Sequence, residues 1–153
     1  MDRTYPGYFK LTSPDFSDGG KIPRECGYKN GNKVPPLTVS GIPEGTKSLA
    51  LIMDDPDAMG AVGKVWVHWV IWNMLNIDGP LSTKRICTWG TNSFGELGYG
   101  GPAPPDKRHT YIFKLYALDT KLDLPDKSTK ADVEKAMEGH IIEQTTLTGT
   151  YAP

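Results

Sequence analysis

The sequence predicts a mainly β fold of the sandwich or barrel type. Glycine and proline number 17 and 13 among 153 residues, an excess that indicates many turns and few long helices. The apolar segments are short, rich in β-branched and aromatic residues, and divided by clusters of turn residues. The chain shows no internal repeat and no linker, so we expect one domain over residues 1–153, large enough to bury an ordinary core.

Six segments are predicted to form strands: residues 8–13, 37–41, 48–54, 65–74, 110–119 and 141–152. The third is apolar at odd and even positions alike, which predicts burial on both faces of a sheet. The fourth is the richest in β-branched and aromatic residues. Regular alternation along it places four side chains on one face: Trp66, His68, Val70 and Trp72.

The remaining segments are predicted to be one helix and two irregular stretches. Residues 129–139 fit a helix, because Ser128 or Thr129 can cap its start and Gly139 can end it. Residues 14–36 are expected to be irregular, and residues 77–108 to form a long connection with at most one short strand. The prolines of "GGPAPP" restrict the backbone of that connection, which favours an ordered and functional loop.

Charge and hydropathy exclude two classes of partner. The formal net charge is -1, so the basic surface of a nucleic-acid-binding domain is absent. No apolar run approaches the 18 or more residues of a membrane span. The opening "MDRTYPGYFKL" lacks the regions of a signal peptide, so we expect a cytoplasmic protein. Cys26 and Cys87 have no CxxC spacing, which leaves open whether they pair.

The candidate functional residues lie at the ends of apolar segments. Asp54, Asp55 and Asp57 surround a proline where the third segment ends, and a simple proline turn needs only one such acid. His68 on its own fits either a core position or a site. His109 lies where the proline-rich loop meets the next strand, and alternation there directs Tyr111 to the same side.

These acids and histidines allow several kinds of chemistry. His68 and His109 are far apart in sequence and lack the HExxH or Cys/His spacing of a zinc site. With Asp55 and Asp57 they could hold a divalent metal or act as an acid–base pair in a hydrolase. A GxSxG motif, a P-loop and a Rossmann fingerprint are all absent from the sequence. The glycine-rich stretch before Gly101 could instead present backbone N–H groups to an anion.

Several short motifs, found in a fixed order along the chain, make the sequence resemble a known family. "DPDA" at residues 55–58, "VHWVIWN" at 67–73, "GYGGPAPP" at 98–105 and "HTYIFKLYALD" at 109–119 occur in that order, after "VPPL" at 34–37. Together they resemble the phosphatidylethanolamine-binding protein family, which includes the Raf kinase inhibitor proteins. The resemblance covers residues 8–152 and is to the short bacterial and archaeal members.

The resemblance implies an antiparallel Greek-key β-sandwich with one or two short helices, and a non-enzymatic protein without a cofactor. Its small pocket would bind an anion, such as phosphate or a phospholipid head group. The ligand-binding residues implied are Asp55, Asp57, His68, Gly101, Pro102, His109 and Tyr111. The resemblance also implies inhibition of a kinase or protease through the pocket rim, and a homodimer. Met59 and Thr110 depart from the family's usual proline and arginine.

Carboxylates repel an anion, so their presence in an anion-binding site needs a physical explanation. We hypothesise that Asp55 and Asp57 orient His68 or His109 and raise its pKa, so that the imidazolium is the charged group offered to the ligand. Two alternatives remain. One is a hydrolase or acid–base enzyme that uses the same residues, and the other is a structural sandwich with satisfied core histidines.

Overall fold

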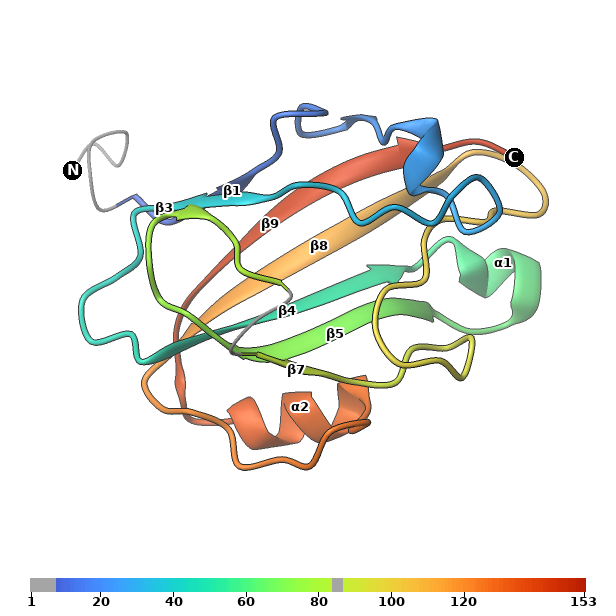
Figure 1. Cartoon of the computed structure of the whole chain (residues 1–153). Coiled ribbons are helices and arrows are strands. Elements are labelled where there is room, and N and C mark those ends of the chain that lie inside the picture. Colours follow the sequence, from blue (N-terminus) through green and yellow to red (C-terminus); the bar gives the residue numbers. More distant parts are fainter. Residues whose placement is uncertain (1–7, 84–86) are drawn as a thin grey trace.

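The chain folds into two packed β-sheets, described here for residues 8–83 and 87–153 of a computed structural model (Figure 1). The absence of a signal peptide was predicted mainly from residues 1–7, which lie outside this range. The large sheet has the order β2-β9-β8-β4-β5-β7 and the small sheet the order β1-β3-β6. Their strands are β1 (Lys10–Thr12), β2 (Gly20–Lys21), β3 (Thr38–Ser40), β4 (Ser48–Asp55), β5 (Trp66–Met74), β6 (Gly79–Pro80), β7 (Thr88–Trp89), β8 (His109–Leu118) and β9 (Ile141–Tyr151).

The predicted β-sandwich is confirmed. The six predicted strand segments form β1, β3, β4, β5, β8 and β9. Among the described strands every pairing is antiparallel except that of β2 with β9. β8 pairs with β4 and not with β5. The long connection after β5 therefore carries the chain from one side of the β4–β5 pair to the other.

The predicted helix is α2 (Lys130–Met137), which begins with a capping box between Thr129 and Asp132. Gly139, two residues after its last turn, has a φ of 78°, which glycine adopts without strain. Four short elements were not predicted: β2 and the 3₁₀ turn η1 (Arg24–Cys26) in the segment expected to be irregular, α1 (Ala58–Val62), and a second strand in the 77–108 connection, which holds both β6 and β7. Residues 84–86 of that connection lie outside the described residues.

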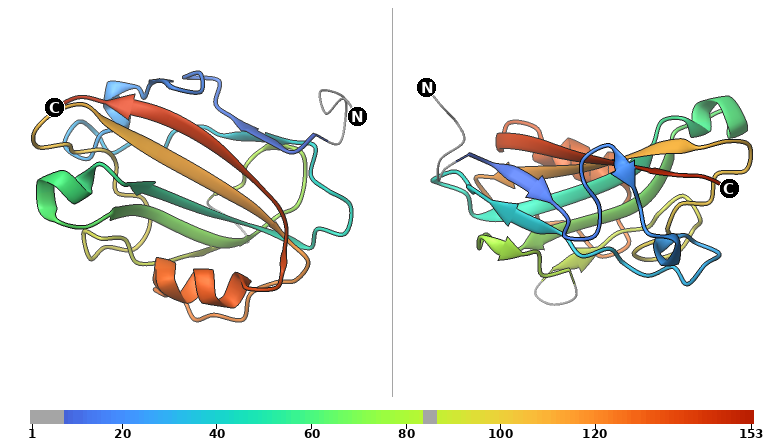
Figure 2. Two further views of the ribbon diagram at one scale, coloured as in Figure 1. Left: turned by 180° about the vertical axis from the view of Figure 1, so that it is seen from behind. Right: turned by 90° about the horizontal axis from the view of Figure 1, so that it is seen from above.

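Both faces of the large sheet are covered by apolar side chains. One cluster fills the space between the two sheets and includes Leu49, Leu51 and Met53 of β4. The other includes Ala50 and Ile52 and lies under α2. The two views of Figure 2 show α2 on the side of the large sheet away from β1 and β3. All eight residues of β4 are therefore buried, as predicted from its unbroken apolar pattern.

A β-bulge places His68 on the opposite face of β5 from the one predicted. Met53 pairs with Trp69 but Asp54 pairs with Val67, so His68 is the extra residue in β5. Val70 and Trp72 consequently pack under α2, whereas His68 contacts Tyr111 on the other face. The prediction that His68 shares a face with Val70 and Trp72 was wrong, because the bulge interrupts the alternation.

Two further findings concern the cysteines and the helices. Cys26 is buried, Cys87 is half-buried, and both are free thiols. In the part of the chain that the structure describes, no helix combines the length and apolar character needed to cross a bilayer.

Candidate functional site

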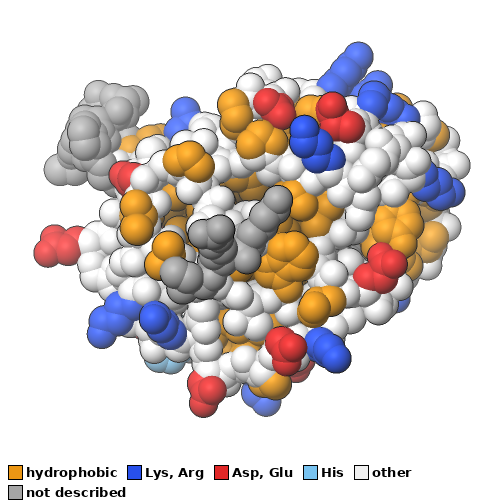
Figure 3. Space-filling model, in the orientation of Figure 1, with side chains coloured by type: hydrophobic (Ala, Val, Ile, Leu, Met, Phe, Trp, Pro, Cys, Tyr) orange, Lys and Arg blue, Asp and Glu red, His pale blue; other side chains and the backbone are white. Residues whose placement is uncertain are grey.

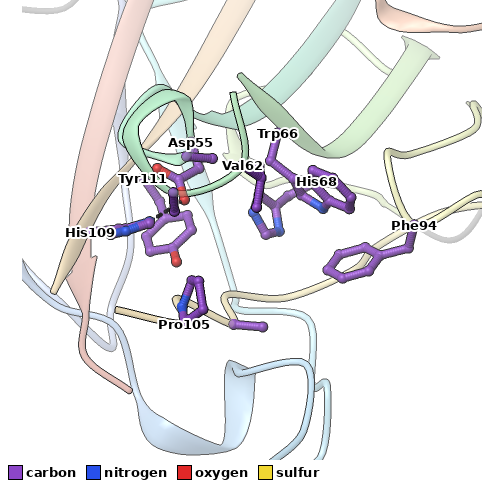
Figure 4. Close-up of a pocket in the computed structure, with 11 residues that line it drawn as sticks. Asp55, Val62, Trp66, His68, Phe94, Pro105, His109 and Tyr111 are labelled. Atoms are coloured by element: carbon purple, nitrogen blue, oxygen red, sulfur yellow. Dashed lines mark hydrogen bonds and ion pairs between the residues drawn. The ribbon is translucent and has the colours of Figure 1, made fainter. Parts of the chain in front are cut away.

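A small cavity opens at the end of the large sheet where β4 ends and β5 and β8 begin. Its volume is about 140 Å³, below the roughly 300–1,000 Å³ of pockets that enclose drug-sized ligands. The side chains around it are shown in Figure 4. They belong to Asp55, Ala58, Ala61, Val62, Trp66, His68, Phe94, Ala103, Pro105, His109 and Tyr111. A cavity of this size suits a single small polar group.

Local strand geometry directs the polar side chains into this cavity. Asp55 is the last residue of β4 and shares the inner face with the odd-numbered residues of that strand. His109 and Tyr111 are two apart at the start of β8, so both point to the same face, as predicted. The bulge in β5 adds His68 to that face. Figure 4 shows the Tyr111 ring between the rings of His109 and His68.

His109 is held between two carboxylates. Its Nδ1 lies 2.6 Å from Asp55 Oδ2 and its Nε2 lies 2.7 Å from Asp106 Oδ1. Burial acts to lower the pKa of His109, but the hydrogen bonds to Asp55 and Asp106 outweigh it, and the pKa is raised. The raised pKa favours the imidazolium form, in which both ring N–H groups donate hydrogen bonds to carboxylates.

Asp106 was not among the predicted site residues. Its carboxyl is 44% exposed, and the hydrogen bond from His109 lowers its pKa. The only signal in the sequence was its position three residues before His109, which does not by itself place the two side chains in contact. The path of the proline-rich loop brings them together.

The pKa of His68 is shifted in the opposite direction from that of His109. Its Nδ1 lies 2.6 Å from the carbonyl oxygen of Gly100, so this nitrogen carries a proton. Burial lowers the pKa of His68 and outweighs the opposing effects of the Gly100 backbone and Asp55. The ring is therefore neutral, and its Nε2 carries a lone pair that can accept a hydrogen bond. The hypothesis that carboxylates raise the pKa of a histidine agrees with the contacts of His109 only in part, because the two acids are Asp55 and Asp106 and not Asp57. Both ring nitrogens of His109 face these carboxylates, so its charge is not offered directly to a ligand, and for His68 the hypothesis fails.

Tyr111 contributes a buried hydroxyl without a hydrogen-bond partner among the described residues. Burial, followed by the charge of Asp55, raises the pKa of Tyr111 and outweighs the opposing effect of the Ala103 backbone, so the hydroxyl stays protonated and can donate. Figure 4 shows it directed towards Pro105, another lining residue. An unpaired buried hydroxyl is costly, which makes it an unusual feature of a folded core.

Trp66 also lines the cavity and has a buried indole N–H without a partner in the described chain. The indoles of Trp69 and Trp72 are likewise unpartnered, but neither lines the cavity. Trp66 packs edge-on against Phe94, with ring centroids 5.4 Å apart, and the two rings form an apolar wall. Strand alternation predicts that Trp66 lies on the same face as His68, but nothing in the sequence marks Trp66 or Phe94 as part of a site.

Three of the predicted site residues lie in the frame of the cavity. Asp57 is exposed, and its carboxylate accepts a hydrogen bond from the backbone N–H of Thr110 at 2.8 Å. Gly101 donates its N–H to Asn32 Oδ1 at 2.7 Å, and the Pro102 carbonyl accepts from the N–H of Tyr28. These contacts fix the turn after β4 and the loop before β8.

The two departures from the family motifs are next in sequence to residues that line the cavity but do not line it themselves. Met59 is 54% exposed on α1, and Thr110 is half-buried beside Asp57. No lysine or arginine lines the cavity in the described chain. Within residues 8–83 and 87–153, no group of three or more His, Cys, Asp or Glu side chains is arranged to hold a metal ion.

Comparison with known proteins gives concordant results. A sequence model of the phosphatidylethanolamine-binding protein family matches residues 12–152. A UPF0098 protein of Methanothermobacter thermautotrophicus is 44% identical over 149 residues, covering 92% of this chain and 97% of the relative. A phosphatidylethanolamine-binding protein homologue from Chlamydia trachomatis superposes with a TM-score of 0.86 at 37% identity, covering 94% and 96% of the two chains. YbcL of E. coli superposes with a TM-score of 0.83 at 32% identity, covering 94% and 97%.

Proposed function

Because the chain belongs to the phosphatidylethanolamine-binding protein family, we propose that it binds the phosphate group of a small phosphorylated ligand or phospholipid head group, without acting as an enzyme. Membership of the family supports a ligand-binding protein, and we assign the ligand to the cavity at the end of the large sheet. The observation that carries this proposal is the Tyr111 hydroxyl, a protonated donor at the cavity with no partner in the described chain.

The polar groups of the cavity are complementary to a phosphate that keeps one proton. Tyr111, and the Trp66 indole beside it, offer neutral donors to phosphate oxygens. The neutral His68 offers an acceptor to a P–O–H group. A fully ionised phosphate would have no proton for His68 and would lie near Asp55 without a lysine or arginine to balance its charge. The cavity therefore favours the monoanion of a phosphate group.

The Asp55–His109–Asp106 chain supports binding in preference to catalysis. Both ring nitrogens of His109 are engaged by carboxylates, which leaves neither free to exchange a proton with a substrate. Its charge offsets part of the negative charge of the two acids near the ligand. We assign Asp55 and His109 to positioning and charge balance, and His68 and Tyr111 to direct contact. Asp57, Gly101 and Pro102 hold in place the turn after β4 and the loop before β8, which surround the cavity.

Inhibition of a protein kinase or protease through the rim remains a further proposal. A carboxypeptidase Y inhibitor shares the fold at 16% identity and a TM-score of 0.59, a likeness that extends to the fold alone. Next to residues that line the cavity, this chain differs from the family pattern at Met59 and Thr110, and the exposed Met59 gives this region an apolar surface.

The test is the affinity for O-phosphorylethanolamine, measured by ligand ³¹P NMR for the wild type and for Tyr111→Phe. Loss of a hydrogen bond to a charged oxygen weakens binding by about tenfold or more. Tyr116→Phe is the matched control, because Tyr116 lies on the same strand but packs under α2. Equal affinity of the wild type and Tyr111→Phe would refute the assignment. Turnover of a phosphorylated substrate would favour the hydrolase alternative.

A further inference from the structure

We propose that a second cavity, beside the first, is a separate binding site for a fully ionised anionic group, a phosphate or a carboxylate, held by Arg24 and Lys29. The cavity has a volume of about 290 Å³ and shares Ala103 and Pro105 with the first. It is lined by Arg24, Lys29, Asn30, Pro102, Ala103, Pro104, Pro105, Tyr151, Ala152 and Pro153. None of the polar side chains of the first cavity belongs to it.

Arg24 is fixed in place by contacts on several sides. Its guanidinium stacks over the Tyr151 ring, 4.2 Å from the ring centroid, and Nη1 donates to the Ala152 carbonyl at 2.7 Å. The Tyr151 hydroxyl donates back to the Arg24 carbonyl at 2.7 Å and accepts from Asn30 Nδ2 at 2.6 Å. Of the five N–H donors of the guanidinium, the described residues accept from Nη1 alone. A positioned arginine loses less conformational entropy when it binds an anion than a mobile one.

The two cations of this cavity, Arg24 and Lys29, have no ion-pair partner among the described residues. Among the same residues, no aspartate or glutamate side chain lines the cavity. In Figure 3 several lysine and arginine side chains, with acidic side chains among them, lie along the upper right edge, the end where η1 and the C-terminus lie in Figure 1. Two unpaired cations on a concave surface attract anions.

The walls keep the cavity open. Pro102, Pro104 and Pro105 have restricted backbones, and proline has no N–H group that could bond across the gap. The Pro102 carbonyl is itself held by the N–H of Tyr28. In the described chain, the first cavity is lined by the carboxylate of Asp55 and by no lysine or arginine, whereas the second is lined by an arginine and a lysine and by no aspartate or glutamate side chain. The two sites therefore select differently charged forms of an anion.

The experiment is an NMR titration with inorganic phosphate, which follows the Arg24 Nε–H, the Asn30 side-chain amide and the Tyr151 backbone amide. We expect these signals to move together and saturate, more strongly at low salt. Arg24→Gln should weaken phosphate binding here about tenfold or more, since it removes charge-assisted hydrogen bonds. Arg24→Lys, which keeps the charge but not the planar donors, should fall between. Lys121→Gln, at the opposite end of β8, is the charge-matched control and should bind as the wild type does.

A second arm distinguishes the source of the anion. A peptide with one phosphoserine binds more tightly than inorganic phosphate if the anion comes from a partner protein, and equally or more weakly if it is a free small anion. Loss of either binding in Arg24→Gln supports the site. Unchanged Arg24 and Asn30 signals at millimolar phosphate, or equal affinity of Arg24→Gln and Lys121→Gln, would overturn it. These signals are separate from those of His68 and Tyr111, so failure of one site does not imply failure of the other.

Discussion

The substitution Asp55→Asn tests the link between the acid of the "DPDA" motif and the histidine of β8. Asp55 Oδ2 lies 2.6 Å from His109 Nδ1, and the two side chains are only 4% and 1% exposed. Asparagine keeps the size of the side chain but removes its charge. It leaves the His109 imidazolium with Asp106 as its one carboxylate partner.

The expected loss of stability follows from burial. Removing one partner of a buried ion pair costs about 3–5 kcal/mol. Here Asp106 remains and His109 can release its proton, so we expect roughly 2–3 kcal/mol at pH 6. For a chain of this length that corresponds to a fall in melting temperature of about 4–12 °C.

The pH dependence has a definite sign. The pKa of His109 is raised in the folded protein, so its charge contributes stability that is complete below the unfolded pKa of about 6.5. That stability is lost as the pH rises through the raised pKa. The difference between wild type and Asp55→Asn should therefore shrink to about 1 kcal/mol at pH 9, where only a hydrogen bond to neutral imidazole remains.

The assay is urea denaturation at pH 6, 7.5 and 9, followed by circular dichroism. Asp119→Asn is the matched control, because Asp119 pairs with His140 at 2.8 Å with both side chains about half exposed. It should cost less than about 0.5 kcal/mol. The reasoning would be refuted by an Asp55→Asn variant as stable as the control at pH 6, or by a stability difference that grows with pH.

Two further predictions concern the loop and the ligand. Gly101→Ala should destabilise the protein by about 1–3 kcal/mol, because an added Cβ would lie 2.0 Å from the Cys26 carbonyl oxygen. In the same denaturation assay Gly60→Ala, where no atom lies within 4 Å, should be neutral, and equal effects at the two glycines would contradict the packing argument. O-phosphorylethanolamine should bind the Arg24→Gln variant, in which the proposed second site is weakened, more tightly at pH 6 than at pH 8 by calorimetry, because a phosphate monoester keeps its second proton only below a pKa of about 6. Tighter binding at pH 8 would show that the first cavity prefers the dianion.

Much of the fold could be predicted from local patterns. The burial of β4 on both faces could be predicted because residues 49–53 are all apolar, and α2 because Thr129 and Gly139 mark its ends. α1 was missed because five residues are too few to show a helical period. The two-residue strands β2, β6 and β7 depend on their partners more than on their own residues.

The sequence predicts which residues belong to the site better than it predicts which of them contact one another. Strand alternation predicted that His109 and Tyr111 lie on the same side, and the family resemblance implied that Asp55 joins them. The face of His68 could not be predicted, because a bulge depends on how β5 pairs with β4. Asp57 was expected beside a histidine, but its carboxylate accepts from the Thr110 backbone. Asp106 reaches His109 through the path of a loop, which no periodic pattern describes.

The most direct test of the central claim is an NMR titration of the three imidazoles of the wild type with phosphate, with and without EDTA. We predict that the His68 and His109 signals shift together and saturate, that His140 stays still, and that EDTA changes nothing. His140 is the internal reference because it lies on the surface, paired with Asp119. A response that vanishes with EDTA would support a metal-dependent enzyme. His68 and His109 signals that ignore millimolar phosphate would contradict the phosphate pocket.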